Sequence, residues 1–223
     1  MKTNEVLENI KTRRSIRAYT SQPVAEEDLQ LILEAATYAP NGMHYETWHF
    51  TAIQDAEKLK ELNRRIKGAF AKSDDPRLQE RGHNENYCCY YHAPALVIVS
   101  NEPVQWWASM DCACAIENMF LAAHSLGIGS CWINQPGTVC DDYEVRELLT
   151  ALGVPTSPGV RMCCFGICRP ACSAERKGCE SRQYYDREIN FPVVSTFCFL
   201  LSQRFAGRKD CRKQHLVVWR KEQ

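Results

Sequence analysis

The sequence predicts a single domain of the α/β or α+β class, in which helices and strands alternate. The chain has 223 residues, enough for one sizeable domain and too few for two domains of ordinary size. Hydrophobic residues make up 45% of it and charged residues 24%, the balance of a globular protein. Runs with helical apolar spacing alternate with short β-branched or aromatic runs, and the chain shows no internal repeat and no Gly-rich or Pro-rich linker.

The first half of the chain predicts helices over residues 4–11, 26–39 and 56–71, and strands over residues 47–53 and 93–100. The second helix starts with acidic residues, which favour that end of the helix dipole, and ends at Pro40-Asn41-Gly42. Residues 73–86 are polar, with clustered charge and no clear period, so we expect a loop or lid there.

In the second half, residues 109–126 predict a long helix whose small and apolar residues surround nearly its whole circumference. Such a helix must be buried on all sides, either in a core or between subunits. Strands over residues 129–134 and 159–166 flank a capped helix over residues 141–152. Beyond Gly166 the chain becomes irregular and basic.

The charge balance argues against nucleic acids and membranes as partners. Lys plus Arg total 27 and Asp plus Glu total 27, so no general field recruits a polyanion, and any anion must be bound by a local cluster. Residues 1–14 lack the apolar core of a secretory signal, and no stretch approaches the roughly 18 to 20 apolar residues of a membrane helix. We therefore expect a cytoplasmic protein with a discrete pocket.

The 13 cysteines are many for such a protein. Several are adjacent or lie in apolar runs, as free cysteines that act as small hydrophobes do, so we expect no disulfides. The spacing of Cys163, Cys164, Cys168, Cys172 and Cys179 leaves a metal or iron–sulfur site open as an alternative. Because it lacks the paired CxxC units of a zinc ribbon and the ferredoxin cysteine run, we predict no metal.

Three segments carry candidate binding chemistry. In Arg13-Arg14-Ser15-Ile16-Arg17, three guanidiniums and a hydroxyl can hold a doubly charged phosphate, although a solvated basic turn has the same composition. After the stop at Pro40-Asn41-Gly42, polar residues that include His44 lead into an aromatic strand. Backbone amides of such a loop can approach a flat ligand, but an ordinary connection has this pattern too. Arg176 and Lys177 either complete the phosphate site or form a solvated surface run.

Together these segments resemble the nitroreductase family of flavoproteins, over roughly residues 6–178. RRSIR is similar to the family's RRSxR segment, whose side chains clasp the FMN phosphate and ribityl chain. APNGMHYETWHF resembles the family loop AP-[SN]-G-x-[NH]-x-[QE]-P-W-x-F, which lies against the flavin. LGIGSCWIN is similar to the Gly-rich strand that covers the other flavin face, and ERKG to the closing basic pair. All four occur in the family's order.

The resemblance implies an α+β fold: a three-layer α/β/α sandwich with a central mixed, mainly antiparallel sheet, a long dimer-interface helix and a C-terminal extension. The FMN-binding domain would span residues 1–191, and residues 192–223 would be an extension of uncertain role. Residues of both chains of a homodimer would hold each FMN, and the helix with apolar residues all round fits such an interface.

The resemblance also implies the chemistry. NAD(P)H would reduce FMN at N5 and leave, and a small oxidised acceptor such as a nitroaromatic or quinone would take its place, so we nominate no catalytic side chain. The residues that would bind FMN are Arg13, Arg14, Ser15, Arg17, Pro40, Asn41, Gly42, His44, Trp132, Ile133, Asn134, Arg176 and Lys177. Arg17 would stabilise reduced flavin near its N1–C2=O edge.

Departures from the family loop keep other functions open. His44 and Glu46 replace the commoner Asn and Gln, as in the branch that dehalogenates iodotyrosines, and Thr47 replaces the usual Pro. That branch also needs a Glu-x3-Tyr lid followed by a Lys. The corresponding region contains Glu80, Glu85 and three tyrosines, but no suitable Lys. The alternatives are dehalogenation or flavin destruction on the same fold, and a non-catalytic flavin or thiol redox sensor.

Overall fold

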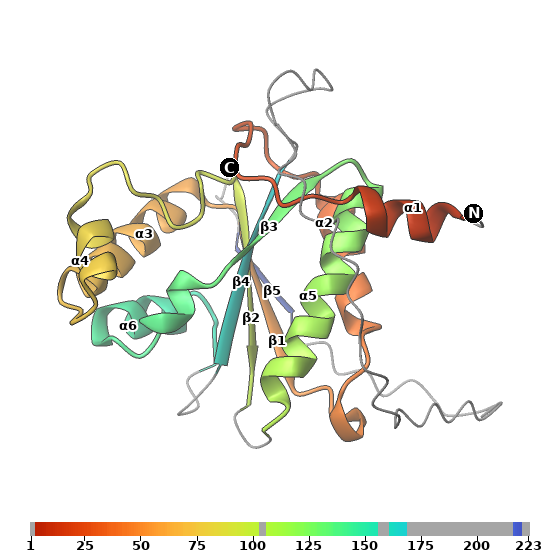
Figure 1. Ribbon diagram of the computed structural model, residues 1–223. Helices are drawn as coiled ribbons and strands as arrows, with labels where there is room; N and C mark the ends of the chain where they lie inside the picture. The colour runs from red at the N-terminus through yellow and green to blue at the C-terminus, as the bar shows by residue number, and fades with distance from the viewer. Residues whose placement is uncertain (1–2, 103–105, 156–160, 169–215, 220–223) are drawn as a thin grey trace, which may run out of the picture. The chain divides into compact units, whose positions relative to one another are not determined.

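The computed structural model describes residues 3–102, 106–155, 161–168 and 216–219 (Figure 1). Its helices are α1 (Glu5–Thr12), α2 (Glu26–Thr37), α3 (Ala56–Ala71), α4 (Pro76–His83), α5 (Ala108–Ser125) and α6 (Tyr143–Ala151), with short 3-10 helices η1 (Gly42–His44) and η2 (Gln135–Thr138). Its strands are β1 (Trp48–Ile53), β2 (Ala95–Asn101), β3 (Gly129–Ile133), β4 (Arg161–Cys168) and β5 (Leu216–Trp219). The helices and strands expected from the sequence all occur, with small shifts in their bounds.

The strands form one sheet in the order β3-β4-β2-β1-β5. The pairs β1–β2, β2–β4 and β3–β4 are antiparallel, whereas β5 runs parallel to β1, which confirms a mixed and mainly antiparallel sheet. β5 comes from the predicted C-terminal extension and places Leu216 opposite Phe50. The domain boundary at residue 191 stays a prediction.

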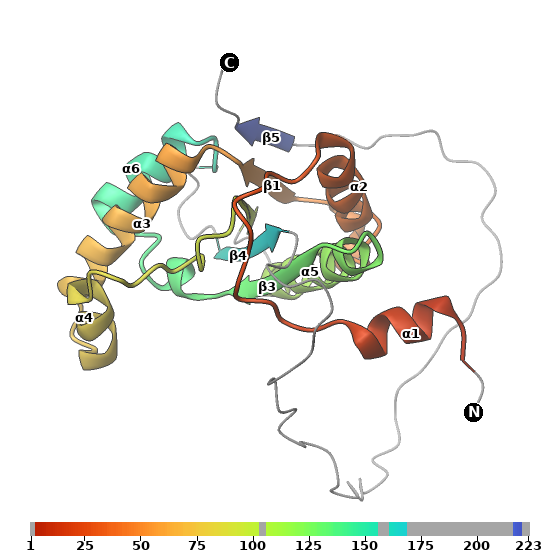
Figure 2. The same ribbon diagram turned by 90° about the horizontal axis from the view of Figure 1, so that it is seen from above.

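Helices cover both faces of the sheet and make the expected three layers (Figure 2). β2 shows why, because side chains along a strand alternate between its two faces. Val97 and Val99 pack into a core with residues of α2 and α5, whereas Leu96 and Ile98 pack into a second core with residues of α3 and α6. Every residue of β2 is buried, which explains its continuously apolar sequence.

The prediction of a loop or lid over residues 73–86 is wrong in part, because this segment contains the helix α4. Asp75 caps this helix by accepting a hydrogen bond from the Arg77 N–H at 2.9 Å, and Pro76 occupies the first turn, where a missing N–H costs little. α4 packs so closely on α3 that a Cβ on Gly82 would overlap the Ala71 backbone. Within α4, which is described throughout, no residue is fully buried, so the sequence lacks the apolar period that identifies helices.

α5 is buried on one face within the chain, rather than on all sides. Its buried residues are Ala108, Cys112, Ala115, Ile116, Met119, Phe120 and Ala123. Met110, Cys114 and Glu117 are exposed. The helix ends in a Schellman motif, in which Gly127 takes a φ of 71° and the Ile128 N–H donates to the Ala123 carbonyl at 2.8 Å. Complete burial of α5 in a core is therefore wrong for the single chain, and an interface between subunits stays a prediction.

Within the described ranges, no helix combines the length and apolar character of a membrane span. The cysteines whose side chains are described are free thiols, and Cys89, Cys112, Cys131 and Cys140 are buried. Burial raises the pKa of the Cys131 and Cys140 thiols, which keeps them protonated and unreactive near neutral pH. The alternative metal site over residues 163–179 lies outside the residues whose side chains are described.

Candidate flavin site

The arginine segment, residues 13–17, leaves the end of α1 and runs beside the edge strand β3. Ser15 forms a parallel bridge with Ser130, and the Ile16 N–H donates to the Ser130 carbonyl at 2.9 Å. Ile16 also packs on Gly129, where a Cβ would lie 3.0 Å from the Ile16 side chain. The arginines of this segment therefore extend from an ordered backbone.

Two of these arginines lie against aromatic rings. The guanidinium carbon of Arg13 is 5.4 Å from the centre of the Phe120 ring, and that of Arg17 is 6.0 Å from the centre of the Tyr91 ring. A guanidinium that lies over a ring keeps its N–H edge available for an anion. Neither aromatic residue stands out in the sequence, because Phe120 belongs to an apolar helix and Tyr91 to a run of tyrosines.

Arg14 has a different role, because it donates to the carbonyls of Lys11 and Arg13 at 2.6 and 2.8 Å and so caps the end of α1. In the part of the chain that the structure describes, no carboxylate lies within ion-pair distance of any of the three arginines. The pKa of His124, at the end of α5, responds to this charge. It is lowered first by burial and then by Arg13 and Arg14.

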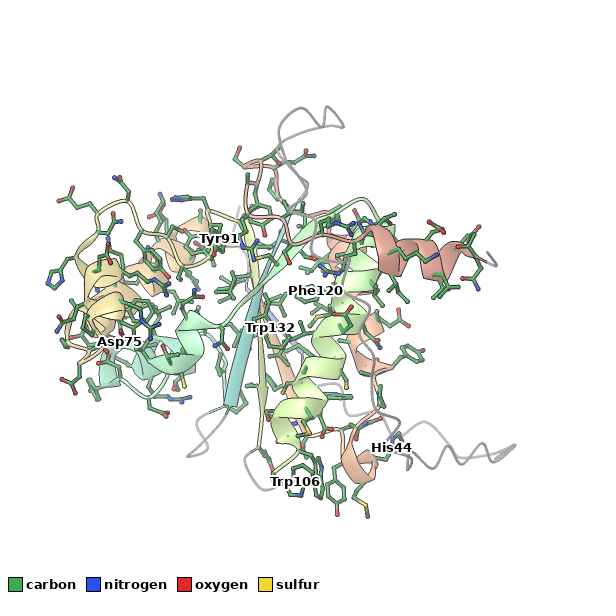
Figure 3. The ribbon with its side chains drawn as sticks, viewed as in Figure 1. His44, Asp75, Tyr91, Trp106, Phe120 and Trp132 are labelled. Carbon is green, nitrogen blue, oxygen red and sulfur yellow. The ribbon has the colours of Figure 1, made fainter. Side chains whose placement is uncertain are left out.

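The end of β3 carries three residues predicted to cover the flavin. Trp132 is 36% exposed and Asn134 is exposed, but Ile133 is fully buried in the core shared with α3 and α6. Because neighbouring strand residues face opposite ways, Trp132 faces α5, where its ring centre is 6.3 Å from that of Phe120. Figure 3 shows Trp132 close to Phe120, and the guanidinium of Arg13 lies over the same Phe120 ring. The side chain of Ile133 does not face this site, which leaves its backbone as the part able to contact a ligand.

The loop of residues 40–46 has an unusual backbone. Three of its residues, none of them glycine, have φ in the left-handed region: Met43 at 54°, His44 at 58° and Glu46 at 51°. The side-chain oxygen of Asn41 accepts a hydrogen bond from the Glu46 N–H at 3.1 Å, which closes the loop on itself. The Gly42 N–H donates to the Asp111 carboxylate at 3.0 Å and ties the loop to the first turn of α5.

The side chains of this loop are largely exposed. Met43, Tyr45 and the adjacent Trp106 are 72%, 55% and 76% exposed, which is a large amount of apolar surface for so short a stretch. Nε2 of His44 lies 3.7 Å from the Glu46 carboxylate. A planar ligand would therefore find aromatic and amide groups here.

The two groups of predicted residues lie at different ends of α5 within one chain. The arginine segment follows α1, which is fastened to the C-terminal part of α5 by a hydrogen bond from the Asn9 amide to the Leu121 carbonyl at 2.9 Å. The loop is fastened at Asp111. At 1.5 Å per residue, these anchors are roughly 15 Å apart along the helix. Figure 3 shows His44 and Phe120 toward opposite ends of α5. The predicted pair at Arg176 and Lys177 lies outside the described residues.

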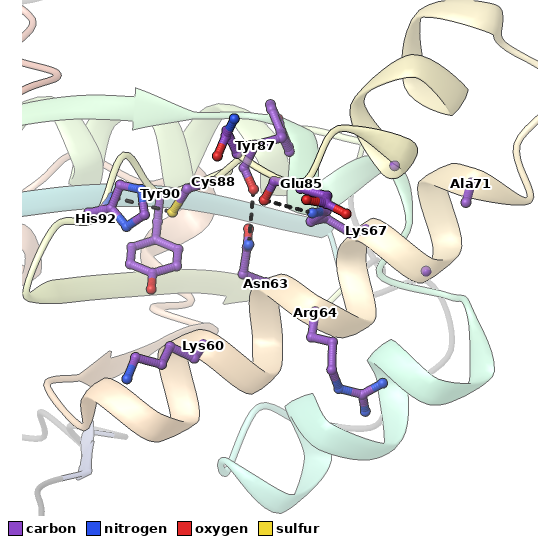
Figure 4. A pocket seen from close by; sticks show the side chains of 13 residues that line it. Lys60, Asn63, Arg64, Lys67, Ala71, Glu85, Tyr87, Cys88, Tyr90 and His92 are labelled. Carbon is purple, nitrogen blue, oxygen red and sulfur yellow. Dashed lines mark hydrogen bonds between the residues drawn. The ribbon is translucent and has the colours of Figure 1, made fainter.

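A separate cavity of about 790 Å³ lies between α3 and the residues that follow α4 (Figure 4). Its basic residues are Lys60, Arg64 and Lys67, and Asn63 lies beside them. Lys60 and Arg64 are each paired with a glutamate of their own helix, at 2.8 and 2.7 Å. Of the described residues predicted to bind FMN, none lines this cavity. The cavity is therefore distinct from the predicted flavin site.

Comparisons with known proteins agree with the fold described above. The chain matches the model of the nitroreductase family over residues 10–167. A nitroreductase of Bacteroides fragilis NCTC 9343, solved with bound FMN, is 62% identical, with a TM-score of 0.75 over 83% of this chain and 100% of its own. A second FMN-bound nitroreductase, from Desulfitobacterium hafniense DCB-2, is 27% identical, with a TM-score of 0.68 over 77% and 92% of the two chains. An NADH dehydrogenase/NAD(P)H nitroreductase of Archaeoglobus fulgidus is 32% identical over 160 residues, 68% of this chain and 78% of its own.

Proposed function

This chain belongs to the nitroreductase family, and on that premise we propose that it is an FMN-dependent oxidoreductase that passes reducing equivalents from NAD(P)H to a small oxidised acceptor. The relatives with bound FMN support the cofactor, and the NAD(P)H-linked relative supports the reductant. The observation that carries most weight is the arginine segment, whose three positive charges have no described carboxylate partner. One of them, Arg13, lies over the Phe120 ring that also packs against the partly exposed Trp132.

The donor set of this segment fits the phosphate of FMN. Guanidinium groups present paired N–H donors that match phosphate oxygens, and the bridge at Ser15 holds the backbone that carries them. In our proposal Arg13, Arg17 and Ser15 hold the phosphate and ribityl chain, with Arg14 adding charge from its position at the end of α1. Arg176 and Lys177 complete the charge cage.

The chain's own residues bind and orient, and no side chain acts as nucleophile or general base. Bound FMN supplies the redox chemistry, because it accepts hydride from a nicotinamide and passes reducing equivalents to an acceptor. Arg17, held over Tyr91, offers fixed positive charge where negative charge develops on reduction. Pro40, Asn41, Gly42 and His44 line one side of the flavin, and Trp132 and Asn134 cover the other, together with the backbone of Ile133. Reductant and acceptor then use the same open face in turn, which is a ping-pong scheme.

We further propose that the active form is a homodimer in which each FMN contacts both chains. The two halves of the site are roughly 15 Å apart along α5 within one chain. Val6 and Ile10 of α1 and Met110 of α5 are 65%, 49% and 54% exposed, apolar surface that a second copy would cover. Sedimentation at micromolar concentration is expected to show a dimer. A monomer that keeps stoichiometric FMN would overturn the composite site.

A cytoplasmic location, without a nucleic-acid or membrane partner, is also part of the proposal. Equal numbers of basic and acidic residues support it, because no general field attracts a polyanion. The free thiols among the described cysteines suit a reducing compartment. Cell fractionation tests the location.

The proposed function is tested by the absorption spectrum and steady-state kinetics of the purified protein. We expect flavin absorption bands, loss of these bands when NADH or NADPH is added without oxygen, and their return when a quinone or nitroaromatic is added. Double-reciprocal plots at several acceptor concentrations should be parallel, as a ping-pong scheme requires. Failure to bind FMN after reconstitution would overturn the function. Bound FMN with negligible NAD(P)H oxidation for every acceptor would instead indicate a non-catalytic flavin module.

Reductive dehalogenation is a second candidate, favoured by one observation. His44 and Glu46 form a pair in the loop predicted to face the flavin, with 3.7 Å between Nε2 and the carboxylate oxygen. A halotyrosine, a nitroaromatic and a quinone compared at equal concentration separate the two candidates. Turnover of the halotyrosine well above that of the other two would replace the proposed acceptor class.

A further inference from the structure

We propose that Asp111 and Trp107, at the start of α5, are positioning residues that hold the 40–46 loop in its left-handed conformation before FMN binds. This inference rests on the proposed function, because it assigns a task to the loop predicted to contact the flavin. Neither residue belongs to the predicted contact set. Both act through Gly42.

Asp111 holds the loop by charge. Its carboxylate accepts the Gly42 N–H at 3.0 Å, and a hydrogen bond to an ionised acceptor is stronger than one between neutral groups. Gly42 opens the 3-10 turn Gly42–His44, so this bond fixes the residue from which the left-handed stretch begins. Within the loop, the Glu46 N–H donates to the Asn41 side chain at 3.1 Å, and the His44 and Tyr45 N–H groups donate to the carbonyls of Asn41 and Gly42. The loop is thus pinned at both ends of the unusual backbone.

Trp107 holds the loop by shape. A Cβ built on Gly42 would overlap the five-membered part of the Trp107 indole, so the ring lies directly on the glycine backbone. Trp106 packs edge-on against Trp107, with ring centres 5.5 Å apart, and supports it from outside. Glycine is required at position 42 for this contact, although its φ lies outside the left-handed region.

A second set of hydrogen bonds fixes the point where the loop enters β1. The Thr47 hydroxyl donates to the side-chain oxygen of Asn101 at 2.7 Å, and the amide of Asn101 donates to the Ala108 carbonyl at 3.2 Å. Asn101 is only 3% exposed, so these bonds are shielded from water. A proline at position 47 would push Glu46 toward extended backbone, so a residue other than proline there is compatible with the left-handed φ of Glu46.

A loop held in place by these contacts should bind FMN more tightly than a loop that is free to move. Non-glycine residues rarely adopt φ near 55°, and such conformations persist where the surroundings impose them. When folding has already imposed the conformation, ligand binding does not have to order the loop, and affinity rises accordingly. Removal of Asp111 should therefore weaken FMN binding although Asp111 itself is not predicted to contact FMN.

The test compares Asp111→Ala and Asp111→Asn with Glu34→Gln, which removes an exposed carboxylate from α2. FMN dissociation constants come from flavin fluorescence, and amide hydrogen exchange is followed in the FMN-free protein. We expect Asp111→Ala to weaken FMN binding roughly 10- to 100-fold, Asp111→Asn to weaken it less, and Glu34→Gln to leave it unchanged. Exchange over residues 41–47 should become faster in both Asp111 variants before any FMN is added.

Two further variants keep the inference open to refutation if Asp111→Ala folds poorly. Gly42→Ala should displace Trp107, and Thr47→Val should remove the bond to Asn101, so each should speed exchange in the loop. Wild-type affinity and exchange in these variants and in Asp111→Asn would overturn the positioning role. Failure of the wild-type protein to bind FMN is a different result, and it would overturn the proposed function itself.

Discussion

The two ends of α5 hold the two halves of the proposed site by different physical means. At the C-terminal end, an edge-strand bridge at Ser15 carries three arginines whose charge no described carboxylate offsets. At the N-terminal end, Asp111 and Trp107 hold a strained loop that carries little net charge. One end is therefore suited to recognise a charged group, and the other a flat shape.

This difference teaches how the halves should respond to change. An arginine acts through charge, so its contribution depends on the phosphate of the ligand and on salt. The loop acts through its conformation, so its contribution depends on the ring system of the ligand and on the contacts that maintain the backbone.

The largest expected effect comes from variants in which each chain retains only one half of the proposed flavin site. An Arg13→Ala/Arg17→Ala chain and a Gly42→Val chain should each lose FMN affinity by about 100-fold or more, since each lacks one half of every site. In a composite dimer, mixing the two chains after denaturation and refolding creates one intact site per mixed dimer. FMN binding should therefore reappear on mixing, as measured by retained flavin absorbance. No recovery would indicate that one chain supplies both halves.

A smaller effect on flavin affinity distinguishes residues that bind the phosphate by charge from residues that maintain the shape of the loop. Arg13→Ala should weaken FMN binding roughly tenfold and leave riboflavin binding nearly unchanged, because riboflavin has no phosphate. Gly42→Ala should weaken both flavins by a similar factor, because it displaces Trp107 and with it the loop. Titrations followed by fluorescence provide both constants. Equal losses of FMN and riboflavin affinity for Arg13→Ala would place Arg13 against the flavin ring rather than the phosphate.

His124 reports the charge at the arginine end. Its pKa is lowered from 6.5 by burial and then by Arg13 and Arg14, and its ring lies 2.9 Å from the Thr12 hydroxyl. A group with a lowered pKa takes up its proton later in the folded state, so stability falls as pH drops below 6.5 toward the folded pKa. We expect a loss below about 1 kcal/mol, since the ring is only partly buried, and His124→Gln should abolish it in urea denaturation.

FMN binding should also change the pKa of His124. A bound phosphate offsets the charge of Arg13 and Arg14, so the pKa of His124 should rise when FMN is added. Proton NMR of the histidine rings measures the shift, and the His83 ring on α4 serves as the control. A pKa of His124 that does not respond to FMN would argue against a phosphate at this end of α5.

The smallest effect lies outside both halves. Arg64 and Arg65 hydrogen-bond to Glu61 and lower the pKa of its carboxyl from 4.5 to about 2. The stability that this contributes is present above pH 4.5 and is lost as pH falls toward 2. Because the cluster lies at the surface and remains in contact with solvent, Glu61→Gln should cost less than about 1 kcal/mol near neutral pH. FMN affinity should not change, and a change would show that the α3 layer is coupled to the site.

Local patterns predict much of the fold. α3 begins and ends as its apolar period and its Asp55 cap indicate, and β2 is buried as its continuous apolar run requires. The patterns fail where a helix buries few side chains, or where the single chain covers only part of its apolar surface. α4 buries no side chain completely, and α5 has apolar residues all round although the single chain covers one face.

The candidate site is predictable in its chemistry and not in its support. The arginines and the Asn-Gly loop are visible because unusual residue types occur close together in the sequence. Phe120, Tyr91 and Trp107 are not, since nothing local distinguishes an aromatic residue that supports a site from one in a core. Ile133 is the opposite case. The motif predicts that it covers the flavin, but its side chain is buried in the core, which its place in the motif does not reveal.

The amino-acid sequence by itself determined most of the helices and strands, where positive charge gathers, and which loop can approach a flat ligand. These are properties of neighbouring residues, and short-range periodicity and composition record them. The tertiary structure decided that the arginines and the loop lie at different ends of one 18-residue helix, and that Asp111 and Trp107 hold the loop. Such relations join residues far apart in the chain, so they arise only when α5 packs against the sheet and its length sets the distance between the two halves.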